Sequence, residues 1–118
     1  MKKALIICNA GMSSSMIAQK VTQFFEGRDL PIQVEATTVT KGKDIIEKDQ
    51  YDLYLLSPQV KMASENLTKS AKAKNKPLLN IEPEAYLPTE ESTIKLAMQI
   101  FPVFKEDLKR EKAEREGR

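Results

Sequence analysis

The chain has 118 residues, and its 19 basic and 17 acidic side chains leave a formal charge of +2 at pH 7, with an aromatic content of 6%. This length suits a single domain, and the near balance of charge together with the few aromatic residues gives no sign of a nucleic-acid-binding surface. With no histidine and one cysteine, the chain can form neither a Ser-His or Cys-His catalytic pair nor an internal disulfide.

The first predicted element is a strand over residues 4–8, which are wholly apolar and are followed by the turn-forming residues Asn9 and Gly11. This run is too short for the hydrophobic core of a signal peptide, and no later run approaches the length of a membrane span. A free thiol at Cys8 is typical of a reducing compartment. We therefore expect a cytoplasmic protein with no segment inserted into a membrane.

The next predicted elements are a helix, a strand and a short helix. Apolar residues recur at helical spacing after Ser13, so that Ser13 or Ser14 can cap this helix and Gly27 can close it. Alternating apolar and polar residues predict a strand over residues 32–36, nearer a sheet edge than the first. Residues 43–48 then form a short predicted helix.

The second half of the chain continues this alternation. Residues 53–56 form a buried apolar strand, residues 60–71 carry apolar side chains at helical spacing, and residues 78–81 form a fourth strand. Strands that alternate with helices predict a three-layer α/β domain, in which a four-stranded parallel sheet of order 2-1-3-4 is flanked by helices. The first strand is apolar on both faces, which places it in the centre.

A last helix is predicted to begin after Thr89, whose hydroxyl can cap it, and to be kinked or ended by Pro102. Its apolar face is expected to consist of Ile94, Ala97, Met98 and Phe101. We expect the domain to occupy residues 1–104 and the charged residues 105–118 to form a helical extension or a frayed end. No long apolar face is left exposed in this arrangement, which favours a monomer.

The position of Cys8 is the one at which such a domain would bind a ligand. In an open parallel sheet, ligands bind beyond the carboxyl ends of the strands, where the strand order reverses. Cys8 ends the central strand, and residues 57–59 follow its neighbour. A cysteine at a strand end can also be simply a small buried hydrophobic residue, so the loop that follows decides between these two interpretations.

The loop after Cys8 is suited to binding an anion. Gly11 allows backbone N-H groups to turn inward, and the helix that follows adds unpaired N-H donors and partial positive charge. These features also favour a thiolate over a thiol. We therefore predict a phosphocysteine at Cys8, with a phosphate-binding loop of Asn9, Ala10, Gly11, Met12, Ser13, Ser14 and Ser15. For any one of the serines, helix capping is an equally good interpretation.

The predicted fold resembles that of the low-molecular-weight tyrosine phosphatases, which carry a clamping arginine in this loop. Here the corresponding residue is Ser14, and no Asp-Pro pair offers a general acid. A phosphatase is therefore disfavoured, and a protein that holds a phosphoryl group and passes it on is favoured. A receiver domain phosphorylated on aspartate is also disfavoured, because no aspartate ends a predicted strand.

The segments ICNAGMSSSM, at residues 7–16, and LLSPQV, at residues 55–60, resemble the IIB component of one branch of the bacterial phosphoenolpyruvate-dependent sugar phosphotransferase system. This is the lactose, cellobiose and chitobiose branch, and the resemblance covers most of residues 3–104. It implies that Cys8 takes a phosphoryl group from a phosphohistidine of the IIA component. It also implies that Cys8 then passes this group to a sugar such as lactose, cellobiose or chitobiose, which is bound by the membrane IIC component. It implies no cofactor. The absence of histidine fits, because the donor imidazole belongs to another protein.

The resemblance also places Ser57, Pro58 and Gln59 beside the phosphate loop, and Tyr86 at the border of the same crevice. Gln59 is as well explained as a helix-start residue that faces water, and Tyr86 is better explained as a packing aromatic. Ser57 departs from the family, in which glycine is common at this position. The competing function is a non-enzymatic module that binds a phosphate or a phosphoprotein without accepting the phosphoryl group.

Overall fold

The computed structural model of the chain describes residues 1–9, 11–58, 60 and 64–117, with their side chains except at residues 11–13. Within these residues, strands β1 (Lys2–Cys8), β2 (Ile32–Thr38), β3 (Leu53–Leu56) and β4 (Leu78–Asn80) form one parallel sheet in the order β2-β1-β3-β4. They alternate with helices α1 (Gly11–Glu26), α2 (Val39–Glu47), α3 (Ser64–Ala73) and α4 (Glu90–Glu116), and a 3-10 helix, η2 (Pro83–Ala85), precedes α4. The predicted fold class and sheet order are confirmed.

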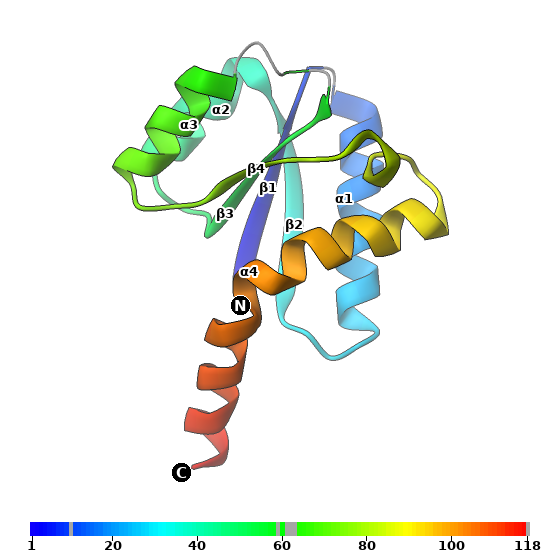
Figure 1. Ribbon diagram of the computed structural model, residues 1–118, viewed down its shortest axis with the longest axis vertical. Helices are drawn as coiled ribbons and strands as arrows, with labels where there is room; N and C mark the ends of the chain where they lie inside the picture. Colours follow the sequence, from blue (N-terminus) through cyan, green and yellow to red (C-terminus); the bar gives the residue numbers. More distant parts are fainter. Residues whose placement is uncertain (10, 59, 61–63, 118) are drawn as a thin grey trace.

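The helices cover both faces of the sheet. α1 and α4 lie on one face, and α2 and α3 lie on the other, which gives the three predicted layers (Figure 1). Ala4 and Ile6 of β1 point into the cluster under α1 and α4, whereas Leu5 and Ile7 point into the cluster under α2 and α3. This burial on two sides explains why β1 is apolar along most of its length.

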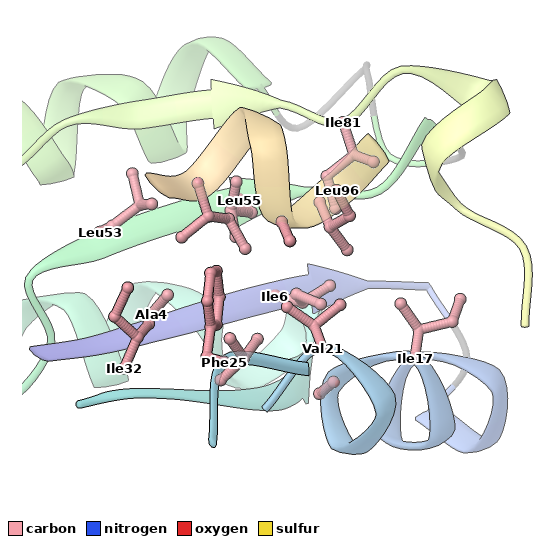
Figure 2. Packing of buried hydrophobic residues seen from close by; sticks show 14 of the residues in the cluster. Ala4, Ile6, Ile17, Val21, Phe25, Ile32, Leu53, Leu55, Ile81 and Leu96 are labelled. Atoms are coloured by element: carbon pink, nitrogen blue, oxygen red, sulfur yellow. The ribbon is translucent and has the colours of Figure 1, made fainter. Parts of the chain in front are cut away.

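The larger part of the core lies between the sheet, α1 and α4. Figure 2 shows Ile6 and Leu55 of the sheet close to Val21 and Phe25 of α1 and to Leu96 of α4. Each of these side chains is at most 1% exposed, and fully burying one of them stabilises the fold by about 1.5–3 kcal/mol. This packing fixes α1 against β1 and so sets the position of the helix that follows Cys8.

The amino-terminal cap of α4 is confirmed, and of the two effects predicted for Pro102, a kink or an end, the helix shows a bend. The Ser92 backbone N-H donates to Thr89 Oγ1 at 3.2 Å. Pro102 does not end the helix, which continues to Glu116 and changes direction midway along its length (Figure 1). A proline inside a helix lacks one hydrogen bond and crowds the preceding turn, so a bend is the expected result.

The predicted apolar face of α4 is wrong in part. Ile94 and Met98 are 36% and 68% exposed. The buried residues are Ser92, Thr93, Leu96, Ala97, Ile100, Phe104 and Leu108. They form one stripe at helical spacing on the side of α4 that packs against the sheet and α1, whereas Ile94 and Met98 lie outside this stripe.

Residues 105–116 continue α4 as a helix that contacts the domain along one side. Leu108 is buried, and Lys2 Nζ lies 3.5 Å from Asp107 Oδ2 and 3.5 Å from Glu111 Oε1. Burial lowers the pKa of Lys2, but Asp107, Asp52 and Glu111 together outweigh it and raise the pKa above its usual 10.5. The start of this charged segment is therefore attached to β1 by ion pairs and by a buried leucine.

Tyr51, just before β3, makes the stability of the fold depend on pH. Its hydroxyl donates to Glu35 Oε1 at 2.8 Å, and burial together with this bond raises its pKa from 10.0 to about 12. The unfolded chain loses this proton near pH 10 while the folded chain keeps it, so the free energy of unfolding falls between pH 10 and about 12. We expect Tyr51→Phe to remove this part of the fall, as measured by urea denaturation. If the free energy of unfolding falls equally in wild type and variant over this pH range, Tyr51 is not the group responsible.

Candidate functional site

Cys8 is the last residue of β1, at the carboxyl edge of the sheet. Strand alternation directs its side chain to the α1 face, as for Ala4 and Ile6. β2 lies on one side of β1 and β3 on the other, so the connections diverge here, as they do at the ligand crevice of open parallel sheets. Cys8 is 0% exposed. The thiol therefore lies at the predicted place and is enclosed by its neighbours.

The first turn of α1 brings Ser14 to the thiol. α1 begins at Gly11, earlier than predicted, so Ser13, Ser14 and Ser15 all lie inside the helix and none of them is its N-cap. Instead, Ser14 is 0% exposed, and its Oγ lies 2.8 Å from Cys8 Sγ. A hydroxyl at this position can donate to a thiolate or to an oxygen of a group bound to the sulfur.

Ser57, directly after β3, is held at the level of Cys8. Its backbone N-H donates to the Ile7 carbonyl at 3.0 Å, which continues the ladder between β3 and β1. The side chain is 1% exposed, and its Oγ has no hydrogen-bond partner among the described residues. A buried hydroxyl left without a partner costs about 1–3 kcal/mol. Such a group is expected where a ligand completes the missing bond.

The Tyr86 hydroxyl lies among Cys8, Ser14 and Ser57. Burial raises the pKa of Tyr86, and the charge of Cys8 raises it further, while the Ser14 and Ser57 hydroxyls act in the opposite direction. Ser57 Oγ is close enough for this effect but does not form a hydrogen bond of normal geometry with Tyr86. The ring is half-buried and packs against the core under α1 and α4. Tyr86 is thus a packing aromatic, as expected, whose hydroxyl also reaches the thiol.

Tyr86 is positioned by the short helix that it follows. Its backbone N-H donates to the Pro83 carbonyl at 3.2 Å, which closes η2. Ser92 Oγ donates to the Glu84 carbonyl at 2.6 Å and so ties η2 to the first turn of α4. The loop after β4 is therefore held by α4, on the same face of the sheet as α1.

For the remaining predicted site residues that it describes, the structure gives the position in the fold. Asn9 and Ser15 are exposed, at the end of β1 and in the first turns of α1, and Pro58 is half-buried. Gly11, Met12 and Ser13 form the first turn of α1, of which only the backbone is described. Ala10 and Gln59 lie outside the described residues. Among the described side chains, those of Ser14, Ser57 and Tyr86 lie around the thiol.

In the described part of the chain, no three acidic, histidine or cysteine side chains are grouped so as to hold a metal ion. Nor does any helix within those residues combine the length and the apolar character that crossing a bilayer requires. The site as described offers a thiol, the hydroxyls of Ser14, Ser57 and Tyr86, and the amino-terminal end of α1.

Residues 3–97 match the family model of the lactose/cellobiose-specific IIB subunit of the PTS system. The chain belongs to this family. The two segments quoted above, which include Cys8 and Ser57, lie within the matched residues, as does Tyr86. As a IIB subunit, the chain is a phosphotransferase component of a sugar-transport system, and the family resemblance seen in its sequence is confirmed.

Two solved structures are similar to this IIB subunit. The lactose-specific IIB component domain of the phosphotransferase system from Streptococcus pneumoniae has 16% sequence identity and a TM-score of 0.69, over 87% of this chain and 97% of that chain. The cellobiose-specific IIB component protein from Borrelia burgdorferi has 25% identity and a TM-score of 0.67, over 89% of this chain and 93% of that chain. None of the curated proteins matches.

Proposed function

We propose that this IIB subunit is a cytoplasmic phosphoryl carrier. Cys8 accepts a phosphoryl group from a phosphohistidine of a IIA partner and passes it to a sugar bound by a membrane IIC partner. The convergence of Ser14, Ser57 and Tyr86 on one buried thiol is the observation that supports this role most directly. The sugar is a β-linked disaccharide such as cellobiose, chitobiose or lactose, in keeping with the lactose/cellobiose designation of the family.

In the first transfer, the Cys8 thiolate attacks the phosphorus of the phosphohistidine. The S–P bond forms and the P–N bond breaks, so that the electron pair stays on the donor imidazole, which then takes up a proton. The donor imidazole comes from the partner, because this chain contains no histidine. Ser14 Oγ, 2.8 Å from the sulfur, donates to the thiolate and holds it in place before the attack.

In the second transfer, a sugar hydroxyl attacks the phosphorus of phosphocysteine. The O–P bond forms, the S–P bond breaks, and the sulfur leaves with the electron pair as a thiolate. The proton of the sugar hydroxyl passes to a base of the membrane partner. Two such steps divide one difficult transfer between proteins into two easier ones, and the thiolate is ready for the next cycle.

The phosphoryl group on Cys8 is held by several donors. N-H groups in the first turn of α1 have no partner within the helix, and this end of the helix carries partial positive charge. Tyr86 is protonated near neutral pH, since even its usual pKa is 10.0 and burial raises it further, and it can therefore donate. Ser57 Oγ gains the partner that it lacks among the described residues. We assign residues 9–15 as the phosphate-binding segment, with residues 57–59 beside it.

Cys8 has no exposed surface, so the partner reaches the sulfur only when the residues around it move aside. The phosphoryl group is transferred without a cofactor. We further propose that residues 1–104 form the IIB domain and that the subunit alone is a monomer. Residues 105–116 then extend α4 beyond the part that the transfer requires.

The competing function is a module that binds a phosphorylated ligand without forming a bond to it. Phosphoenolpyruvate, the general proteins of the phosphotransferase system and a IIA protein supply the phosphoryl group, and mass spectrometry of the denatured subunit measures the result. We expect a gain of about 80 Da, the mass of one phosphoryl group, that depends on the IIA protein. A subunit that binds phosphate in native mass spectra but shows no gain after denaturation would instead be a binding module.

A further inference from the structure

A long groove lies between α4, the carboxyl-terminal end of α1 and the turn over residues 28–31. Two hollows of about 490 Å³ and 580 Å³ compose it, and they share Arg28, Leu30 and Phe101. The turn lies beside the start of β1, because the Lys2 backbone N-H donates to the Pro31 carbonyl at 2.9 Å. Cys8 lies at the other end of this seven-residue strand, about 20 Å away. The groove is therefore remote from the phosphoryl site.

The first hollow is apolar. Its walls include Phe24 of α1 and Ile94, Met98 and Phe101 of α4, of which Met98 is 68% and Ile94 36% exposed. A contiguous exposed apolar surface is a feature of sites at which another molecule binds. Ile94 and Met98, two of the four residues that the sequence predicted to form a buried face, are thus exposed on this hollow.

The second hollow is basic. Its lining includes Arg28, Lys105, Lys109, Lys112 and Arg115, and Asp29 is the acidic residue among its described lining. Within the described part of the chain, Arg28, Lys105, Lys109 and Arg115 form no ion pair, whereas Lys112 lies 4.0 Å from Glu116. Asp107 and Glu111 of the same helix point elsewhere, to Lys2. α4 therefore presents unneutralised positive charge to the groove.

We propose that this groove is a docking site for a segment of a partner protein in which apolar side chains are followed along the chain by carboxylates. The apolar and basic halves succeed each other along α4, from Ile94 and Met98 to Lys109 and Arg115. A helix that lies on an anionic membrane separates its apolar and basic residues around the helix axis instead. A concave surface also fits an inserted peptide better than it fits a flat bilayer.

Docking at this groove leaves the carboxyl edge of the sheet open. In Figure 1, the carboxyl-terminal half of α4 projects beyond the end of the molecule at which β1 begins, opposite the arrowhead of β1. A partner can therefore remain bound while a phosphoryl group enters and leaves at Cys8. The groove would keep the carrier close to a partner through repeated transfers, because a second contact raises the effective concentration of the first.

The test measures binding of a short fluorescein-labelled peptide with leucines in one half and glutamates in the other, by fluorescence polarisation with the full chain. Lys105→Glu combined with Lys109→Glu, and separately Met98→Glu, are expected to weaken binding by at least about fivefold, and added salt should weaken it too. Lys69→Glu, an exposed charge reversal on α3, is the matched control and should have no effect. Each variant should still be phosphorylated, since the groove is remote from Cys8.

A scrambled peptide of the same composition should bind more weakly than the segregated one. Equal binding of the two peptides, or equal binding by wild type and both groove variants, would overturn the proposal. Binding to phosphatidylglycerol vesicles that the groove variants lose, without peptide binding, would assign the surface to a membrane. A dimer in light scattering that Met98→Glu dissociates would assign it to a second copy. Either of these results would also overturn the proposal.

Discussion

Cys8→Ser is expected to abolish phosphorylation by the IIA donor while the fold is retained. Serine is close to cysteine in size and can keep a hydrogen bond to Ser14, whose Oγ now lies 2.8 Å from the sulfur. Its hydroxyl, however, stays protonated near neutral pH and is a poor nucleophile without an adjacent base, and the chain has no histidine to supply one. Mass spectrometry of the denatured variant should show no gain of about 80 Da, and circular dichroism should match wild type.

Cys8→Ala serves as the second variant, because a serine hydroxyl at a fully buried position can itself disturb packing. Alanine removes the sulfur without adding a polar atom, at the cost of a small cavity. Both variants should remain folded and unphosphorylated. If either one gains a phosphoryl group at the wild-type yield, the nucleophile is a different residue, and the proposed carrier mechanism fails.

The sheet was predictable because β1 is buried on both faces. A strand in that position needs apolar residues on both sides of the chain, and residues 4–8 supply them. Once β1 is central, the rule for ligand sites in parallel sheets brings Cys8 and Ser57 to the same edge. The sequence could therefore place the thiol at its site without any knowledge of side-chain packing.

The contact between Ser14 and Cys8 could not be predicted from the residue pattern around Ser14. A serine near the start of a helix is commonly its cap, but here α1 begins at Gly11 and turns Ser14 toward β1, where it meets Cys8. The residue at which the helix begins decides which serine faces the thiol, and the local sequence does not determine that residue. A different signal was more useful: in the resemblance to the low-molecular-weight tyrosine phosphatases drawn from the sequence, Ser14 corresponds to the clamping arginine.

The faces of α4 depend on tertiary packing in the same way. Ile94, Ala97, Met98 and Phe101 form a good apolar stripe on an isolated helix, yet the sheet and α1 select the stripe through Leu96, Ile100 and Phe104. Two apolar stripes exist in the sequence, and only the position of the neighbouring elements decides which one is buried. The position of the Tyr86 hydroxyl could not be predicted from the sequence either, because η2 and its hydrogen bond to α4 position the ring.

Ser14→Ala is expected to slow phosphoryl transfer to Cys8 by about tenfold to a hundredfold without unfolding the protein. In the proposed mechanism this hydroxyl donates to the Cys8 thiolate, and a hydrogen bond to a charged group contributes about 1.5–3 kcal/mol, which corresponds to this range of rates. Alanine fits the fully buried position, because it removes one oxygen and adds nothing. An arginine, as in the phosphatases, has no room there unless the first turn of α1 moves.

The measurement is the single-turnover rate of transfer from phosphorylated IIA protein, followed by rapid quenching. Ser70→Ala is the matched control, since Ser70 lies on α3, on the other face of the sheet, and bonds only the Asn66 carbonyl of its own helix among the described residues. The Ser70→Ala subunit should accept the phosphoryl group at the wild-type rate. Ser14→Thr should recover part of the rate lost in Ser14→Ala, because threonine restores a hydroxyl. A Ser14→Ala subunit that transfers at the wild-type rate and melts at the wild-type temperature would mean that this hydroxyl only fills space beside the thiol. The anion site would then depend on the α1 backbone, Ser57 and Tyr86.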